Sequence, residues 1–267
     1  MLTSLQNPLA KQIRKLHQSK HRRQQQLFLL EGIHLLEAAL AAGAPLQTVC
    51  CTPDWHSTHP QLWQALSQHA QRAELVSTEL LRSLATTVEP NGAIATVQRQ
   101  PSALNTLPDI RLGFAVETLQ DPGNLGTIIR TAAAAAVEGI WVSADSVDLD
   151  HPKVLRASAG TWFCVPMTTS PNLEAMVSNY RDRGFQIVAT LPTAQKTYWQ
   201  ADLTQPTIVL LGNEGAGLSS NLVALATEQV SIPLAAGVES LNVSIAAALI
   251  AYEAQRQHQK QALANST

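Results

Sequence analysis

The sequence predicts an α/β protein in two parts, the second of which is built on a parallel β-sheet. Strand-like and helix-like segments alternate regularly after residue 109, which is typical of a parallel sheet with helices on both faces. A shorter alternation occupies residues 28–98. Between the two, residues 101–109 contain two prolines and no periodic pattern, which indicates a linker.

The first part, residues 1–103, is predicted to be a small α/β domain. Apolar residues at helical spacing predict a helix over 28–43, which Gly43 and Pro45 end. Further elements are expected as strands over 46–52, 73–77 and 93–98, and as helices over 61–71 and 77–86.

The second part, residues 109–260, repeats the strand–helix unit. We expect strands over 111–117, 139–144, 163–167, 185–191, 206–212 and 228–234, and helices over 124–136, 151–160, 173–184 and 241–257. In sheets of this class, ligands bind beyond the carboxyl ends of the strands. The loops that follow these strands are therefore where a site is expected.

Composition narrows the class of protein. With 45% hydrophobic and 14% charged residues, the chain is not predicted to be disordered. We find no apolar run of about 18 residues and no signal-peptide pattern. Cys50, Cys51 and Cys164 show no CxxC spacing, so we expect idle, reduced thiols, no metal site, no membrane partner and a cytoplasmic protein.

Charge is distributed unevenly, although the net charge is only −2. Residues 1–30 contain no acid and six cations: Lys11, Arg14, Lys15, Lys20, Arg22 and Arg23. Such a segment is either a basic arm that attracts nucleic acid or the solvated face of a helix.

The first motif, DPGNLGTIIR at 121–130, follows a predicted strand and opens a helix. Asn124 suits a helix N-cap, and Gly126 permits close approach of a backbone or ligand. The glycine spacing is not that of a dinucleotide fingerprint, and no Walker A lysine follows. Alone, the segment is equally compatible with an ordinary strand–helix turn.

Two further motifs follow later strands. LLGNEGAGLS at 210–219 holds three glycines around Glu214. Its backbone groups are available to a ligand, and its carboxylate favours a neutral or cationic group over a phosphate. In IPLAAGVESLNVSIAAAL at 232–249, Glu239, Ser240 and Asn242 gather at a helix start. Ser240 is either the helix cap or a site residue.

Together, the three motifs resemble the SpoU (TrmH-type) family of RNA ribose methyltransferases, of the SPOUT superfamily. The resemblance covers 117–257, and HPKVLRASAG at 151–160 also resembles the family. One departure is alanine within 132–140, where many members have an aromatic-glycine pair. At the front, TSLQNPLAKQIRKL and FLLEGIHLLEAAL resemble the family's substrate-binding module, which is itself similar to RNA-binding ribosomal proteins.

The resemblance implies a deep trefoil knot in the second domain, with S-adenosylmethionine bound there mainly through backbone groups. It also implies a homodimer, with the helix 241–257 as a candidate interface, and metal-free methyl transfer to a ribose 2′-hydroxyl. Ribosomal RNA is the expected substrate, because the front module accompanies ribosomal RNA enzymes more often.

Residue by residue, the resemblance assigns chemistry to Asn124, Arg130, Glu214, Ser240 and Asn242. It assigns the cofactor to Leu191, Leu211, Gly212, Ile232, Leu241 and Val243. Arg156 and Ser158 are secondary candidates for phosphate contact or for support of the first motif. For RNA binding we expect Lys11, Arg14, Lys15, Arg22 and Arg23 of the basic arm, together with Arg156.

Arg130 corresponds to the residue that the family places at the centre of the chemistry. A guanidinium stays protonated in proteins, so we expect Arg130 to bind an RNA phosphate and stabilise the developing 2′-oxyanion rather than remove a proton.

Other functions remain open at this point. The substrate is alternatively a tRNA, or the chain is a non-catalytic RNA-binding or ribosome-assembly factor that keeps the fold. A nucleotide-binding enzyme is a third reading, which the missing Walker and dinucleotide signatures disfavour. A self-protecting role in antibiotic resistance is a further variant of the methyltransferase reading.

Overall fold

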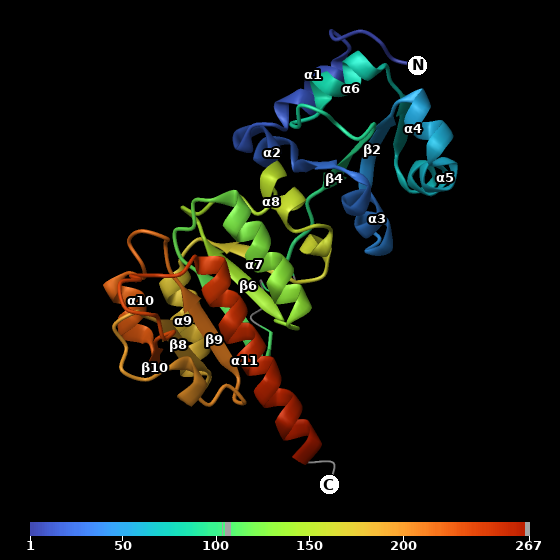
Figure 1. Ribbon diagram of the computed structural model, residues 1–267. Coiled ribbons are helices and arrows are strands. Elements are labelled where there is room, and N and C mark those ends of the chain that lie inside the picture. The colour runs from blue at the N-terminus through green and yellow to red at the C-terminus, as the bar shows by residue number, and fades with distance from the viewer. Residues whose placement is uncertain (103, 105–107, 265–267) are drawn as a thin grey trace. The chain divides into compact units, whose positions relative to one another are not determined.

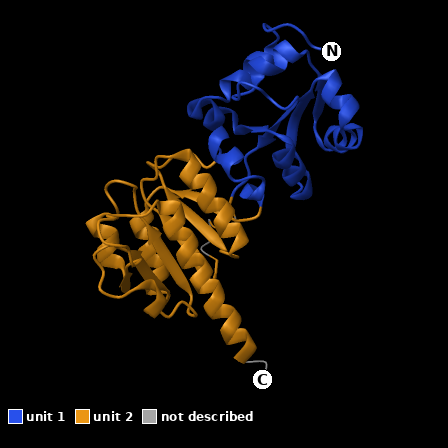
Figure 2. Ribbon diagram, in the orientation of Figure 1, with its two compact units in different colours: residues 1–101, 150–163 blue, residues 102–149, 164–267 orange. Residues whose placement is uncertain are grey.

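The computed structural model describes residues 1–102, 104 and 108–264. The chain forms two compact units (Figure 2), of which unit 1 comprises Met1–Pro101 and Asp150–Phe163, and unit 2 comprises Ser102–Leu149 and Cys164–Thr267. The predicted linker over 101–109 and the predicted domain end at residue 103 fall partly outside the described residues. Residues 150–163 interrupt unit 2 in sequence yet belong to unit 1.

Unit 1 is built on a four-stranded mixed sheet in the order β1-β4-β2-β3. Its strands are β1 (Leu27–Glu31), β2 (Leu46–Cys51), β3 (Arg72–Leu75) and β4 (Ala93–Gln98). β4 runs antiparallel to both β1 and β2, whereas β2 and β3 are parallel.

Helices pack on both faces of this sheet (Figure 1). They are α1 (Pro8–Lys15), α2 (Ser19–Gln25), α3 (Ile33–Ala41), α4 (Pro53–Thr58), α5 (Pro60–His69), α6 (Thr78–Leu84), α8 (Pro152–Ala157) and the 3-10 turn η2 (Thr161–Phe163). Alternate residues of β1 enter different cores: Leu30 packs with residues of α3 and α5, and Leu29 with residues of α1 and α6. The sheet therefore has an apolar core on each side.

The helix predicted over 28–43 is wrong in its first four residues. They belong to β1, all five residues of which are buried, and Gly32, with φ of 100°, separates this strand from α3. A strand covered on both faces is apolar throughout, so its sequence shows no alternation. The helix α4 has no predicted counterpart.

The segment predicted as a helix of the second part, 151–160, shortens to α8 and completes unit 1. Leu155 is fully buried in the core that includes Phe28, and the Phe28 and Trp162 rings lie 5.1 Å apart. Removing this segment from unit 1 would expose that core.

Unit 2 is built on a six-stranded sheet in the order β10-β8-β9-β5-β6-β7. Every neighbouring pair is parallel, which confirms the predicted α/β fold with a parallel sheet. The strands are β5 (Leu112–Val116), β6 (Gly139–Ser143), β7 (Met167–Ser170), β8 (Gln186–Thr190), β9 (Thr207–Leu211) and β10 (Glu228–Val230).

Two layers of helices accompany this sheet: α7 (Pro122–Ala134) packs beside α11 (Val243–Ala264), and α9 (Leu173–Asp182) packs beside α10 (Ser220–Leu225), as in Figure 1. The 3-10 turn η3 (Tyr198–Gln200) contacts α11. Within the described part of the chain, none of the helices combines the length and apolar character that crossing a membrane requires.

Several boundaries in unit 2 differ from the prediction, and α11 runs to Ala264 where the helix was expected to end at residue 257. The strand expected over 163–167 is wrong: η2 ends at Phe163, and β7 begins only at Met167. The strand expected over 228–234 keeps only three residues, as β10. The N-cap of α7 is Asp121, not Asn124, because the Asp121 carboxylate accepts the Gly123 and Asn124 amides at 2.6 and 2.9 Å.

The three cysteines differ in environment. Cys50 and Cys51 are buried in β2, whereas Cys164 is exposed. Burial raises the pKa of both the Cys50 and the Cys51 thiol to about 12.

We expect iodoacetamide at pH 8 to modify Cys164 alone in the folded protein, because Cys50 and Cys51 remain protonated thiols and are shielded from the reagent. Peptide mass spectrometry measures this, and alkylation in denaturant, where all three cysteines react, is the control. Rapid modification of Cys50 or Cys51 in the folded protein would contradict the burial of β2.

Candidate active site

A hollow lies at the carboxyl ends of β8, β9 and β10, where the second and third predicted motifs begin. It has a volume of about 340 Å³, which falls in the size range of small-molecule sites, roughly 300–1,000 Å³. The loops after these strands and the start of α11 line it with residues 190–192, 212–215, 217, 218, 230, 232, 234, 239–241, 243 and 246. Residues from distant parts of unit 2 thus meet at one edge of the sheet.

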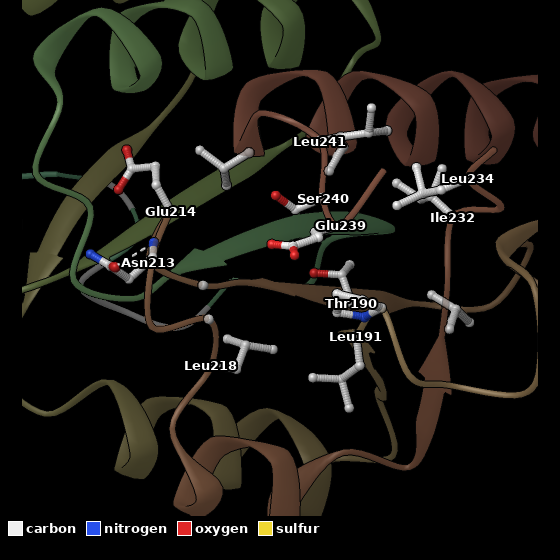
Figure 3. A pocket seen from close by; sticks show the side chains of 17 residues that line it. Thr190, Leu191, Asn213, Glu214, Leu218, Ile232, Leu234, Glu239, Ser240 and Leu241 are labelled. Carbon is white, nitrogen blue, oxygen red and sulfur yellow. Dashed lines mark hydrogen bonds between the residues drawn. The ribbon is translucent and has the colours of Figure 1, made fainter. Parts of the chain in front are cut away.

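The walls of the hollow are apolar with a few acidic and hydroxyl groups among them. Its apolar side chains include Leu191, Leu218, Ile232, Leu234 and Leu241. Figure 3 shows the Glu239 carboxylate and the Thr190 hydroxyl in the middle of the lining residues. Apolar walls suit a planar ring, and carboxylates suit a cationic group.

The glycine-rich loop after β9 folds back on itself through Asn213. The Asn213 side-chain oxygen accepts the amides of Gly215 and Ala216 at 2.8 and 2.9 Å. Its backbone exchanges two 3.0 Å hydrogen bonds with Gly217. A Cβ on Gly212 would lie 2.4 Å from the carbonyl carbon of Gly217, so only glycine fits where the two arms of the loop cross.

Three predicted residues form a continuous hydrogen-bonded chain. The Asn242 Nδ2 donates to Asn124 Oδ1, and the Asn124 Nδ2 donates to Glu214 Oε1, both at 2.9 Å. At its other end, Asn242 Oδ1 accepts the backbone amide of Ser244 at 2.8 Å. An amide N–H can only donate and a carboxylate can only accept, so the two ends fix the orientation of both asparagine side chains.

Two other predicted catalytic residues lie apart from this chain. Ser240 lines the hollow and is exposed, while Asn242, not Ser240, caps the first turn of α11. Arg130 is exposed on the C-terminal half of α7. Within the ranges that the structure describes, its side chain makes no hydrogen bond or ion pair, so the structure does not join it to Glu214.

The predicted cofactor residues fall mostly on the hollow. Its lining includes Leu191, Gly212, Ile232, Leu241 and Val243. Leu211 is fully buried in β9 and is not among the lining residues. The prediction missed Thr190, Leu218, Leu234 and Glu239 as lining residues. Three of these stand within two residues of one that was named, so the available signal was their nearness in sequence to a predicted site residue.

The predicted RNA-binding cations lie in unit 1, and one of them is a correction. Arg22 is only 1% exposed, and its Nε donates to the buried Asp150 at 3.0 Å. The Arg99 Nε donates to the other oxygen of Asp150 at 2.6 Å. If Arg22 turned to an RNA phosphate instead, the buried Asp150 carboxylate would keep only Arg99 to balance its charge.

The remaining cations of the basic arm are on the surface or near it. Lys11 and Lys15 are exposed on α1, and Arg23 is exposed on α2. Arg14 is half-buried and donates to the Leu5 carbonyl at 2.5 Å. The arm is therefore two folded helices, whose apolar residues Ala10 and Ile13 are buried.

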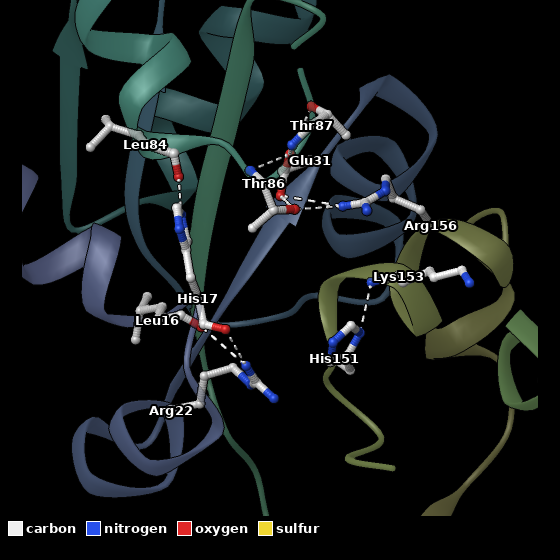
Figure 4. Close-up of polar contacts among 10 residues, drawn as sticks. All are labelled: Leu16, His17, Arg22, Glu31, Leu84, Thr86, Thr87, His151, Lys153 and Arg156. Carbon is white, nitrogen blue, oxygen red and sulfur yellow. Dashed lines mark hydrogen bonds and ion pairs between the residues drawn. The ribbon is translucent and has the colours of Figure 1, made fainter. Parts of the chain in front are cut away.

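Arg156 also makes its hydrogen bonds within unit 1. Its Nη1 donates to the Thr86 hydroxyl at 2.7 Å and lies 3.4 Å from Glu31. The buried Glu31 carboxylate also accepts the amides of Thr86 and Thr87 at 3.0 and 3.2 Å, a cluster visible in Figure 4. Ser158 is fully buried and donates to Leu155. The expected support of the first motif by Arg156 or Ser158 stays a prediction.

Metal ligands are a separate question. Over residues 1–102, 104 and 108–264, we find no group of three or more His, Cys, Asp or Glu side chains that could hold a metal ion.

Comparison with known proteins gives two matching family models. The SpoU rRNA Methylase family matches residues 111–252, and the MRM3-like substrate binding domain matches residues 7–95. The two matched segments correspond to most of unit 2 and unit 1, respectively.

Individual relatives extend over nearly the whole chain. An uncharacterized tRNA/rRNA methyltransferase of Synechocystis sp. is 48% identical, over 96% of this chain and 93% of the relative. The 23S rRNA (uridine(2479)-2′-O)-methyltransferase of Streptomyces viridochromogenes is 33% identical, over 86% of this chain and 83% of the relative.

Among solved structures, an AdoMet-bound rRNA methyltransferase from Sinorhizobium meliloti superimposes with a TM-score of 0.87 and 31% identity, over 96% of this chain and 97% of that one. The family model spans more than half of the 267 residues and includes the hollow's Gly212 and the whole Asn242–Asn124–Glu214 chain. This chain belongs to the SpoU rRNA Methylase family.

Proposed function

We propose that this protein transfers a methyl group from S-adenosylmethionine to a ribose 2′-hydroxyl of ribosomal RNA. The observation that carries the proposal is the hollow at the ends of β8, β9 and β10, whose wall includes Glu214, the end of the Asn242–Asn124–Glu214 chain. Relatives named as rRNA 2′-O-methyltransferases match along most of the chain, and a neighbouring structure holds AdoMet.

The hollow suits this cofactor in size and in chemistry. Leu191, Ile232 and Leu241 offer apolar surface to the adenine ring, whose edge would be met by backbone groups of the surrounding loops. Glu214 and Glu239 place carboxylates beside a ligand that carries a sulfonium and an ammonium group. When bound, S-adenosylmethionine supplies a methyl group on a sulfonium sulfur, which is a good leaving group without a metal.

The residues around the hollow would orient the ribose rather than bind it through one strong contact. Asn124 fixes one oxygen of the exposed Glu214 carboxylate, and Asn242 fixes Asn124. The other oxygen of Glu214 would accept the hydrogen bond of the 2′-hydroxyl, and the Ser240 hydroxyl would contact the same group. Holding the 2′-oxygen in line with the methyl carbon is a large part of the rate enhancement that such sites provide.

Arg130 would act through its positive charge. Its guanidinium stays protonated, so we assign it to an RNA phosphate and to the negative charge that develops on the 2′-oxygen. Its exposed position and lack of a partner within the described ranges leave all its donors available for this role.

Unit 1 would select the RNA. The exposed lysines of α1 and α2, Lys11, Lys15 and Lys20, would attract the phosphate backbone. The match of residues 7–95 to a substrate-binding domain supports this division of labour.

We also propose a homodimer, a trefoil knot and a cytoplasmic location. The α11 face that includes Ile245 and Tyr252, which are 49% and 50% exposed, supports the dimer. It borders a shallow hollow completed by Tyr198, and exposed apolar residues at this density suggest a protein contact. The pairing of β10 with β8, followed by the return of α11 to α7, supports the knot.

A tRNA substrate is the second candidate, because the Synechocystis relative is named for both RNA classes. Radiolabelled S-adenosylmethionine, incubated with the protein and either unmodified 23S rRNA or total tRNA, separates the two. We expect label in 23S rRNA, at one ribose that reverse transcription at low nucleotide concentration can map. Label in tRNA alone would reject the rRNA assignment, and label in neither would reject the enzyme.

Replacing Arg130 by alanine is expected to lower methyl transfer by about 10²–10³-fold, the usual loss when a group that stabilises developing charge is removed. Because Arg130 does not line the hollow, the affinity for S-adenosylmethionine should not change. Arg111→Ala, at another exposed arginine of unit 2, is the matched control. A rate within threefold of wild type for Arg130→Ala would contradict the assignment.

Replacing Gly212 by alanine is expected to destabilise the protein by about 1–3 kcal/mol and to abolish cofactor binding, because the new Cβ meets the Gly217 backbone. Thermal unfolding and titration calorimetry with S-adenosylmethionine measure the two effects. Ala216→Ser adds one atom to the same loop at an exposed residue that is not among the lining residues, and should leave both unchanged. Normal cofactor affinity in Gly212→Ala would count against the loop as part of the site.

Replacing Lys11, Lys15 and Lys20 together by glutamine is expected to weaken RNA binding and to flatten its salt dependence. Each lost phosphate contact lowers the slope of log K against log salt by about 0.7–0.9. Filter binding at several salt concentrations measures this. The matched control replaces three cations of unit 2, Arg111, Lys196 and Lys260. If both sets change the slope equally, α1 and α2 are not the RNA surface.

A further inference from the structure

Thr118, directly after β5, has an unusual backbone conformation. Its φ is +51°, in the left-handed region that β-branched residues rarely enter. Strained conformations of this kind persist when the surrounding contacts over-determine them, and they gather at functional sites. Thr118 is neither among the residues lining the hollow nor in the Asn242–Asn124–Glu214 chain.

Three hydrogen bonds hold Thr118 in this conformation. Its amide donates to the Ser143 hydroxyl at 2.7 Å, and its hydroxyl donates to Asp145 Oδ2 at 2.8 Å. Its carbonyl accepts the Asn213 Nδ2 at 2.7 Å. The hydrogen bonds from the Ser143 and Thr118 hydroxyls lower the pKa of Asp145, so this carboxylate remains an acceptor at neutral pH.

The bond to Asn213 links Thr118 to the glycine-rich loop. The Asn213 side-chain oxygen accepts the amides of Gly215 and Ala216, which closes that loop. Its side-chain nitrogen donates to the Thr118 carbonyl. A single amide therefore joins the internal turn of the loop to the β5–α7 connection. With φ in the ordinary negative range, the peptide groups on either side of Thr118 would turn and this bond would be lost.

The residue before Thr118 holds the other end of the same loop. The Glu117 Oε2 accepts the backbone amide of Ser219 at 2.7 Å, and the Glu117 amide donates to the Leu211 carbonyl at 2.8 Å. Two consecutive residues thus bind the loop where it begins and where it ends. Between those points the loop carries Glu214 and lines the hollow.

We infer that Glu117, Thr118 and Asn213 are positioning residues that hold the loop 213–219 in the shape required to bind S-adenosylmethionine and to present Glu214. This inference rests on the proposed function for its ligand. It assigns a task to the β5–α7 connection, which fixes the cofactor loop at both ends.

Asn213→Asp tests the inference at its centre. The new carboxylate still accepts the Gly215 and Ala216 amides, but it places an oxygen against the Thr118 carbonyl in place of the donor. We expect the Kd for S-adenosylmethionine, measured by calorimetry, to rise about tenfold or more. Hydrogen exchange over residues 212–219, measured without cofactor, should accelerate, while RNA affinity stays the same.

Asn221→Asp is the matched control. The Asn221 Nδ2 donates to Glu174 at 3.0 Å on the exposed side of α10, so the same substitution places a carboxylate against an acceptor away from the hollow. It should change neither the cofactor Kd nor the exchange of 212–219. An equal effect in both variants would overturn the inference.

Thr118→Val and Thr118→Ser decide the matter if Asn213→Asp fails to fold. Valine keeps the shape but loses the hydroxyl bond to Asp145, so exchange of 212–219 should accelerate and the cofactor Kd should rise; serine keeps the hydroxyl and should restore both. Wild-type behaviour of Thr118→Val would overturn the inference. If the wild-type protein itself binds no S-adenosylmethionine, the proposed function fails, whereas the cofactor-free exchange comparison still tests how the loop is held.

Discussion

The hydrogen bonds between the β5–α7 connection and the loop after β9 are the constraint on which the candidate site depends. A loop with three glycines has many backbone conformations, and ordering it costs more entropy than ordering other residues. Here the loop meets Glu117 at one end, Thr118 at the other and Asn124 in the middle. The five residues between β5 and α7, together with Asn124 in the first turn of α7, therefore hold the loop that carries Glu214.

In unit 1, paired buried charges hold the segment 150–163 in place. Asp150 and Glu31 are buried carboxylates, and a buried charge is tolerated only when it is compensated. Arg22 and Arg99 compensate Asp150, while Arg156 and two threonines compensate Glu31. Asp150 and Arg156 both belong to the segment 150–163. This segment is attached to unit 1 by paired charges at two points as well as by the burial of Leu155.

Much of the fold could be predicted from the sequence, because unit 2 repeats a regular pattern. Strand boundaries such as β4 and β9 follow from apolar runs bounded by glycine and proline. The strand β1 could not be separated from α3, because a strand buried on both faces carries no alternation. Arg22 could not be separated from the surface lysines, since its partner Asp150 lies 128 residues away in the sequence.

The candidate site, too, could be predicted only in part, because its partners lie far apart in the sequence. The motifs named Asn124, Glu214 and Asn242, but spacing could not show that they form one chain, because its bonds span 90 and 118 residues. Thr118 carried no sequence signal, and Asn213 was not singled out, although it lies inside the second motif. A left-handed threonine looks like any other threonine in a sequence, and its importance is visible only once its three partners are in place.

The direction of the hydrogen bonds in the chain also bears on the chemistry. Asn242 and Asn124 have their donors and acceptors committed to each other, to Ser244 and to Glu214. Among the residues assigned to the chemistry, one oxygen of Glu214, the Ser240 hydroxyl and the guanidinium of Arg130 have no partner within the described residues. An acceptor and a cation are the two groups that a nucleotide needs, since its 2′-hydroxyl donates and its phosphate is negative. In the proposed function, the asparagines would fix the geometry and the two charged residues would contact the RNA.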